Sequence, residues 1–248
     1  MKRLFIGFIL LSISNHLFAS DNLEFFLVSQ PDTIKIITLH YSDSLPDSSA
    51  YINIDYPQIK DFENKAVEEK VNNFFKDEFE QSILWYDEIA ADTSEVDSFE
   101  FNFSYSFETG FNVEYNSNKF LSISLDHYQY TGGAHGNFYS SGYNIDMKTG
   151  KVLPLSDIIN NDSFDILSYE CEQAILDSFQ VNSLTEAGLF DDEISVPPDQ
   201  DYYIIPGALV LQFDPYEIGP FSMGELNVEI PFNKIKDILK ENLPFPTN

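Results

Sequence analysis

The chain of 248 residues is 43% hydrophobic, which is enough for a substantial core in one large domain or two small ones. Its formal net charge is −28, and no arginine follows Arg3. Because the guanidinium fork is the usual device for binding phosphate and carboxylate groups in a bidentate manner, this composition argues against nucleic acid and anionic substrates as partners.

The N-terminus has the pattern of a secretory signal peptide. Lys2 and Arg3 precede an apolar run over residues 4–13, and a small residue follows at Ala19. We expect cleavage after Ala19, export to the periplasm or the medium, and no membrane insertion afterwards. The alternative is a retained anchor, but about ten apolar residues are too short to span roughly 30 Å of hydrocarbon.

The charge of the exported chain is also informative. Without residues 1–19, 11 lysines remain against 41 acidic residues, which gives a net charge of −30. Such a field attracts basic proteins or cations and raises their encounter rates. A role in solubility alone accounts for the charge equally well.

Strands and one long helix are predicted for the first part of the exported chain. Apolar residues recur every three to five positions from Phe62 to Ile83, which predicts an amphipathic helix with Asp61 as its N-cap. An acidic loop follows at residues 87–98. The strands before the helix are expected at residues 25–28, 34–39 and 51–56, the last of them ending at Pro57.

A run of strands is predicted for the middle of the chain. Aromatic residues alternate with polar ones from Phe99 to Phe107, and this period of two indicates a strand with one buried face. The order of the segments favours an antiparallel meander. Further strands are expected at residues 111–115, 120–130 and 137–145, with turns at 116–118 and 148–151.

A second helix is predicted at residues 163–179, with an apolar face that includes Phe164, Cys171 and Phe179. Cys171 is the single cysteine, so it forms no intramolecular disulfide and is expected to be a small buried hydrophobe. The remaining elements are an acidic, solvated loop at 191–201, strands at 202–205, 209–213 and 226–230, and a helix at 232–243.

Strands that cluster, and do not alternate with helices one by one, favour an α+β fold with antiparallel sheets and a few packed helices. Two lobes are one arrangement that fits this pattern. The chain would then divide into the signal peptide at 1–19, an N-terminal lobe at 20–130 and a C-terminal lobe at 131–248.

The most unusual stretch runs from Tyr130 to Gly136, and its three glycines permit positive φ and close approach of another backbone. It lacks the lysine and the helix of a phosphate-binding loop. A metal site here would use His135 with His127 or Asp126. However, His127 shares a strand face with apolar residues and is expected in the core, whereas Asp126 points to the opposite face. A structural or recognition loop is therefore favoured.

No other signature of catalysis or cofactor binding stands out. The sequence has neither a HExxH zinc motif nor a GxSxG nucleophile motif, and the loop at 191–201 misses the spacing of an EF-hand. We therefore predict no catalytic residue, no metal and no cofactor, while the many carboxylates leave acid–base catalysis open.

Five stretches form a further pattern: Ile54–Ile59, Leu121–Ser124, Tyr130–Gly136, Asn144–Lys151 with Leu155–Asp157, and Phe213–Pro220. Together they resemble the extracytoplasmic, lysozyme-binding domain of the RsiV-like family of anti-sigma factors. A similar accessory region accompanies the catalytic domain of the peptidoglycan deacetylase PdaC. The resemblance covers roughly residues 50–240, and many relatives look like exported proteins of unknown role.

The resemblance implies a binding domain whose loops at residues 131–137 and 214–219 face a partner. Neither the sigma-binding part of the anti-sigma factor nor the metal-binding Thr-Phe-Asp-Asp string of the deacetylase occurs here. The alternative is that glycine and proline in these loops only shape tight turns. The candidate partner-binding residues are Tyr130, Thr131, Gly132, Gly133, His135, Asn137, Tyr216 and Glu217.

Three functional hypotheses follow. The first is an exported non-enzymatic protein that binds lysozyme or another basic protein active on the cell envelope. The second is an accessory module that binds peptidoglycan or another cell-wall glycan. The third is a metal-assisted hydrolase or deacetylase that would use His135 and nearby carboxylates.

Overall fold

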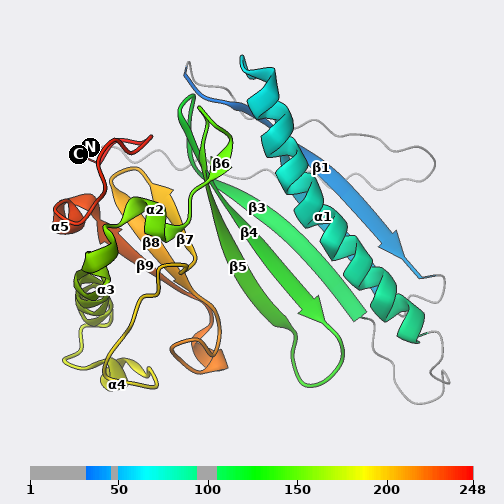
Figure 1. Ribbon diagram of the computed structural model, residues 1–248. Helices are drawn as coiled ribbons and strands as arrows, with labels where there is room; N and C mark the ends of the chain where they lie inside the picture. Colours follow the sequence, from blue (N-terminus) through cyan, green and yellow to red (C-terminus); the bar gives the residue numbers. More distant parts are fainter. Residues whose placement is uncertain (1–31, 46–49, 94–104, 248) are drawn as a thin grey trace, which may run out of the picture.

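The computed structural model describes residues 32–45, 50–93 and 105–247. The expected signal peptide, the strand expected at 25–28 and most of the alternating stretch at 99–107 lie outside the described residues. The described chain is an α+β fold of two sheets and several helices, which confirms the predicted fold class (Figure 1). Within these ranges, no helix is long and apolar enough to cross a membrane.

Six strands form the larger sheet, in the order β1-β2-β3-β4-β5-β6. The antiparallel pairing of β3, β4 and β5 confirms the predicted meander, and the short strand β6, where the sequence predicts a turn up to residue 151, extends it. β2 and β3 pair in parallel, because the helix α1 (Lys65–Thr93) carries the chain back between them. The strands are β1 Lys35–Ser44, β2 Ala50–Lys60, β3 Tyr105–Ser117, β4 Phe120–Tyr130, β5 Asn137–Asp146 and β6 Lys151–Val152.

Two strand boundaries differ from the prediction. Residues 105–107, the described end of the strand expected at 99–107, and the strand expected at 111–115 belong to one strand, β3, which passes through Gly110 and pairs with β4. β2 does not end at Pro57. That proline lies beyond Ile54, the last residue of β2 paired with β3. At Pro57 the strand pairs only with β1, so the edge toward β3 needs no backbone N–H there.

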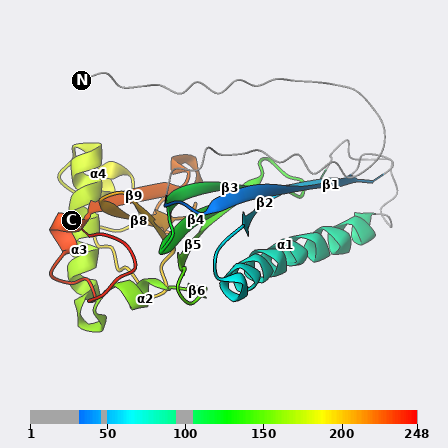
Figure 2. The same cartoon turned by 90° about the horizontal axis from the view of Figure 1, so that it is seen from above.

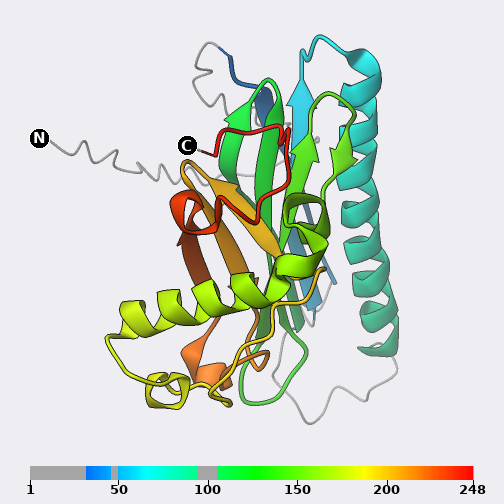
Figure 3. The same ribbon diagram turned by 60° about the vertical axis from the view of Figure 1, so that its left-hand side comes forward.

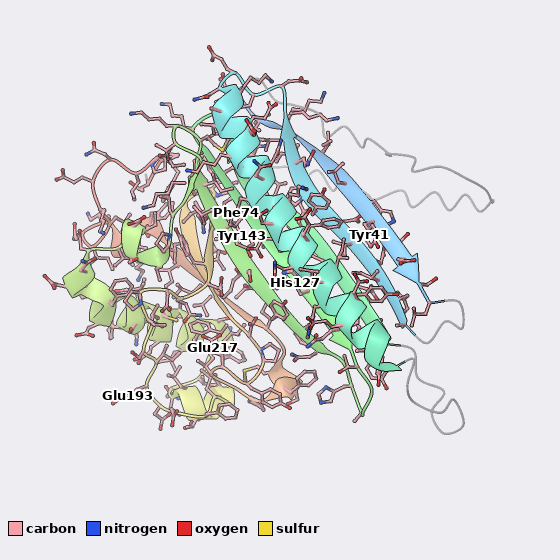
Figure 4. All side chains as sticks on the ribbon, turned by 45° about the vertical axis from the view of Figure 1, so that its right-hand side comes forward. Tyr41, Phe74, His127, Tyr143, Glu193 and Glu217 are labelled. Atoms are coloured by element: carbon pink, nitrogen blue, oxygen red, sulfur yellow. The ribbon has the colours of Figure 1, made fainter. Side chains whose placement is uncertain are left out.

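The helix α1 covers one face of the larger sheet (Figure 2). Its Val67, Val71 and Phe75 are at most 5% exposed and share a core with isoleucine and leucine side chains of the sheet. Figure 4 shows Phe74 beside Tyr143 of β5, and their ring centroids are 5.0 Å apart. The apolar face predicted for this helix is therefore confirmed.

The helix α1 starts and ends later than predicted. At its start, Asn64 Oδ1 accepts a hydrogen bond from Val67 N (3.4 Å), so Asn64 and not Asp61 is the N-cap. At its other end, the helix continues to Thr93 through much of the expected acidic loop. Just past the predicted end at Ile83, Tyr86 is still buried, with its ring in edge contact with Phe107 of β3.

Three antiparallel strands form the second sheet, in the order β7-β8-β9. The helix α3 (Phe164–Phe179) packs against this sheet through Leu167, Cys171 and Ile175, all at most 1% exposed (Figure 3). Burial raises the pKa of the Cys171 thiol to about 12, so the expected buried cysteine is confirmed. The other elements are β7 Tyr202–Ile205, β8 Ala208–Phe213, β9 Leu226–Pro231, α2 Leu155–Ile158, α4 Leu184–Ala187, α5 Phe232–Ile235, and the 3-10 turns η1 Asn161–Ser163 and η2 Phe221–Met223.

Two predictions for this part are wrong. Phe179 does not face the core, because it ends α3 with 39% of its surface exposed. The C-terminal helix is one turn, α5, and not a helix over 232–243. The chain leaves that helix to pair with an earlier segment, where Asn160 N donates to Ile238 O (2.9 Å) and Lys240 N donates to Ile158 O (2.8 Å).

The acidic segment at residues 191–201 is only partly solvated. Ile194 and Val196 are buried in the core of the second sheet. Their backbone N–H groups donate to side chains of α3, Ile194 N to Glu172 Oε1 and Val196 N to Ser168 Oγ, each at 2.9 Å. The segment is therefore attached to the helix and not free in solvent.

Buried hydrogen bonds join the two sheets along β5. Asn144 Nδ2 donates to Tyr202 O (2.7 Å), and Asn144 Oδ1 accepts from Ser122 Oγ (2.7 Å). Ser122 Oγ in turn accepts from Ile204 N (2.9 Å). A Cβ atom at Gly142 would overlap the Tyr202 carbonyl oxygen, so only glycine allows the backbones to approach this closely.

The chain leaves the larger sheet after Val152, the last residue of β6. The lobe boundary expected at residues 130 and 131 lies between β4 and β5, which pair with each other over ten residue pairs. A division of the chain at that point stays a prediction about folding units.

Candidate functional site

An open groove of about 450 Å³ lies on the larger sheet. Strand alternation explains the position of the groove. The odd-numbered residues Leu121, Ile123 and Leu125 of β4 face α1. The even-numbered Asp126 and Tyr128 therefore lie on the opposite face of the sheet, away from the helix. We call this site the open-face groove. Its lining residues are Asn53, Asp55, Glu108, Thr109, Gly110, Asp126, His127, Tyr128, Phe138, Tyr139, Ser140 and Glu225.

Two carboxylates share one hydroxyl at the centre of the groove. Ser140 Oγ of β5 lies 2.9 Å from Asp126 Oδ1 and also within hydrogen-bond distance of Glu225 Oε2. Amide groups donate to the outer oxygens, Asn112 Nδ2 to Asp126 Oδ2 (2.9 Å) and Asn227 Nδ2 to Glu225 Oε1 (2.7 Å). The two acids are therefore held in place by neutral donors.

Two more carboxylates line the groove from neighbouring strands. Glu108 Oε1 of β3 accepts a hydrogen bond from Tyr51 OH of β2 (2.9 Å). Asp55 Oδ1 of β2 lies 2.7 Å from His40 Nδ1 of β1. The acidic lining thus extends from β5 across the sheet to β2.

Aromatic side chains form the end of the groove near the β4–β5 hairpin. Tyr128 of β4 is 40% exposed, and it pairs in register with the half-buried Phe138 of β5. A Cβ atom at Gly136 would collide with the Tyr128 ring. Glycine at position 136 therefore lets the hairpin close against that ring.

The two loops expected to face a partner, 131–137 and 214–219, are linked at this end through Phe221, which lies just beyond the second loop. The His135 ring stacks on Phe221, with centroids 3.9 Å apart and an interplanar angle of 21°. Phe221 also contacts Phe138 (5.5 Å) and Tyr216 (5.6 Å). Tyr216 is 58% exposed. We call His135, Phe138, Tyr216 and Phe221 the aromatic cluster, and it joins the loop after β4 to the segment after β8.

The other predicted residues of the first loop shape it or lie on its surface. Tyr130 OH donates to Gly133 O (2.9 Å). Gly132 and Gly133 both have positive φ, 94° and 95°, a conformation that favours glycine. Thr131 and Asn137 are exposed. Whether these residues contact a partner stays a prediction.

The side chain of Glu217 forms hydrogen bonds within the fold. Its Oε2 accepts from Asp214 N and its Oε1 accepts from Gln200 Nε2, both at 2.8 Å. Asp214 Oδ1 accepts from Ser140 N of β5 (3.1 Å). These bonds fasten the turn after β8 to the edge of the larger sheet, so Glu217 holds the loop that presents Tyr216.

The groove and its margin are strongly negative. Partial burial raises the pKa of Asp214 to about 6, against its hydrogen bond from Ser140 N and with help from Glu217 and Glu225. Burial also raises the pKa of Tyr203 to about 12, and Glu114, Glu225 and Asp126 add to this effect. A cation placed here would be stabilised by the same field.

His127 lies at the edge of the core and not within it. It is half-buried, its ring stacks on Tyr139 at 4.5 Å, and its Nδ1 lies 3.1 Å from Thr109 Oγ1. Burial lowers its pKa, against the opposing charge of Asp126. Figure 4 shows it under α1. In the part of the chain that the structure describes, no group of three or more His, Cys, Asp and Glu is placed to hold a metal ion.

Sequence reasoning finds the loops but misses most of the open-face groove. The sequence signal for the groove is the alternation over residues 120–130, which places Asp126 and Tyr128 on the face opposite the apolar residues. Glu225 and Phe221 come from a segment with no periodic pattern, so only the structure places them beside β5.

Two family models match the chain. Residues 46–138 match the model described as deacetylase PdaC, and residues 156–233 match the model described as a protein of unknown function, DUF3298. The chain is 22% identical over 196 residues to the peptidoglycan-N-acetylmuramic acid deacetylase PdaC of Bacillus subtilis strain 168. That match covers 76% of this chain but only 38% of the relative. Together these matches support a PdaC-related DUF3298 domain; the RsiV-like resemblance stays a prediction.

Solved structures share the fold. A DUF3298 family member from Bacteroides fragilis matches with a TM-score of 0.70 and 17% identity, covering 85% of this chain and 95% of that one. A DUF3298 family protein from Pseudomonas aeruginosa matches with a TM-score of 0.68 and 20% identity, covering 88% of this chain and 99% of that one. At these identities the likeness establishes the fold alone.

Proposed function

We propose that the chain is an exported, non-catalytic binding module whose open-face groove takes a cell-wall glycan. The observation that carries this proposal is the pairing of aromatic faces with hydrogen-bonding oxygens in one open groove. Tyr128 and Phe138 supply flat apolar surface, while Asp126 and Glu108 lie beside them on the same sheet face. Sugar rings present apolar C–H faces and a rim of hydroxyl donors, and a groove of this composition meets both needs.

The relationship to PdaC supports a role at the cell envelope. The name of that relative states an action on peptidoglycan, whereas the present chain matches only 38% of its length. A domain that accompanies such an activity could hold the polymer for it. Export through the N-terminal signal would bring the groove to the same compartment.

A basic protein such as lysozyme is the second candidate partner. The net charge of −28 supports it, because a negative surface attracts basic proteins. The exposed Tyr216 at the margin of the aromatic cluster would suit a protein interface, since tyrosine is enriched in such contacts.

Sedimentation of the purified protein with insoluble peptidoglycan tests the leading proposal. The Tyr128→Ala variant should bind more weakly, because it removes the exposed aromatic face on which a sugar ring would rest. Tyr169→Ala is the matched control, because Tyr169 is an equally prominent tyrosine, 56% exposed, on α3. Failure to sediment, or equal loss in both variants, would count against the groove.

Calorimetric titration with a C-type lysozyme at low and moderate salt tests the second candidate. One-to-one binding that weakens with salt would support a protein partner. Absence of heat at both salt concentrations would remove it.

A further inference from the structure

We propose that the open-face groove selects glycans whose sugars carry free amino groups, in preference to N-acetylated sugars. The inference rests on the proposed glycan-binding function and names the chemical class of its ligand. An amino sugar is a cation when protonated, whereas an N-acetylated sugar is neutral at that position. The preference therefore depends on how charge is arranged in the groove.

All charged side chains in the lining, apart from a half-buried histidine, are carboxylates. Asp55, Glu108, Asp126 and Glu225 line the groove, and neither lysine nor arginine does. Asp55 of the lining forms an ion pair with His40, and both side chains of that pair are about half exposed. The groove is thus an anionic surface without a fixed counter-charge of its own.

The hydrogen bonds between Ser140 and its two neighbouring carboxylates also leave one of them short of a donor. Ser140 has one hydroxyl proton, yet its Oγ lies within hydrogen-bond distance of both Asp126 and Glu225. It can donate to only one of the two carboxylates at a time. Asn112 and Asn227 supply the other donors, and both are neutral. An ammonium group brings three donors and a positive charge, and it would donate to whichever of the two carboxylates receives no proton from Ser140.

The aromatic end of the groove fits the rest of such a ligand. The exposed ring of Tyr128 and the neighbouring Phe138 offer faces to the C–H surface of a sugar. An aromatic face also attracts a cation within about 6 Å. A sugar ring seated on Tyr128 would have its substituents directed toward the acids on the same sheet face, where Asp126 is two residues earlier in β4.

Charge also favours a cell-wall strand that carries amino groups over one that carries only carboxylates. Carboxylates on a ligand would meet four carboxylates in the groove, and like charges at close range are repelled. Removal of an acetyl group from an N-acetylated sugar leaves a free amine. The groove would therefore recognise the product of a deacetylation reaction, which is the reaction class named for the relative in Bacillus subtilis.

The test is calorimetric titration of the purified protein with two probes of equal length, glucosamine oligomers and N-acetylglucosamine oligomers, at a pH where the amino groups are protonated. We expect the glucosamine oligomer to bind about tenfold tighter or more, with an affinity that falls as salt is added. Equal affinity for both probes would overturn this inference and leave the proposed function standing. Binding of neither probe, together with no binding to peptidoglycan, would overturn both.

Charge-neutral variants separate the groove from the overall charge. Asp126→Asn and Glu225→Gln should each weaken glucosamine binding about five- to tenfold and change N-acetylglucosamine binding little. Glu193→Gln is the matched control, because it removes one charge from an exposed residue of the segment attached to α3 (Figure 4). Equal losses in all three would refute a specific site. A thermal melt checks that each variant is folded. If Asp126→Asn does not fold, Glu225→Gln alone provides the test.

Discussion

Replacing Asn144 by alanine tests the junction between the two sheets most directly. The side chain of Asn144 is fully buried, as is that of Ser122. The change removes the donor to Tyr202 O and the acceptor of the Ser122 hydroxyl, both at 2.7 Å in the native protein. A buried polar group that loses its partner costs about 1–3 kcal/mol. Two such groups give an expected loss of about 2–6 kcal/mol in the free energy of unfolding.

Urea denaturation followed by circular dichroism and by Trp85 fluorescence measures this loss. The protein has a single tryptophan, and its ring contacts Phe107 of β3, so its fluorescence reports on the larger sheet. Asn137→Ala is the control, since Asn137 is exposed at the start of the same strand and should change stability by less than about 0.5 kcal/mol. A loss below about 0.5 kcal/mol in Asn144→Ala would refute the reasoning.

A double-mutant cycle then checks whether the bond between the two side chains is the cause. Ser122→Ala deprives Ile204 N of its acceptor as well as removing the donor to Asn144 Oδ1. Residues in one hydrogen-bond network show coupling energies of about 0.5–3 kcal/mol. Additive losses in the double variant would show that Asn144 and Ser122 act separately.

Three further predictions concern the core and the margin of the groove. Gly142→Ala should lower the free energy of unfolding by about 1–3 kcal/mol or more in urea titrations, because a Cβ atom there overlaps the Tyr202 carbonyl; an unchanged midpoint would contradict the packing. Asp214 has a folded-state pKa of about 6, above its unfolded value of about 3.9, so its contribution to stability is greatest below the unfolded pKa and is lost as pH rises through about 6. Asp214→Asn keeps an acceptor for Ser140 N and should flatten that part of the pH dependence of unfolding; an identical pH profile would refute this assignment. Cys171 should resist thiol reagents in the native protein and react only on unfolding, since its pKa is about 12 and its side chain is buried; rapid labelling without denaturant would disprove its burial.

The sequence predicts those parts of the fold in which one face of an element is buried. The meander from β3 to β5, the helix α3 and the strands β7, β8 and β9 all follow from alternating or helical patterns. The prediction fails where a distant contact overrides the local pattern. α1 extends into the expected loop, beyond its predicted end at Ile83, and Tyr86 in this extension packs against Phe107. The C-terminal helix stops because Ile238 and Lys240 pair with residues 158–160.

The candidate site was predictable to a similar extent. The glycines near His135 mark a special turn from the sequence alone. The structure brings that turn to Phe221, which lies two residues beyond the second expected loop and contacts its Tyr216. The acids of the groove were not predictable as a group. Asp126 and Glu225 are about a hundred residues apart in the chain, and no local pattern encodes their common neighbour Ser140.

The way the turn after β8 fastens to β5 has a consequence for how the protein behaves at high concentration. β6 pairs only with Ile145 and Asp146, so the outer edge of β5 before them is left without a neighbouring strand in the larger sheet. The carboxylates of Asp214 and Asp201 accept hydrogen bonds from Ser140 N and Gly142 N along that edge. An unpaired edge is a template for strand addition by another molecule. Here an incoming strand would have to displace two carboxylates and the second sheet, so this edge is protected against aggregation and domain swapping.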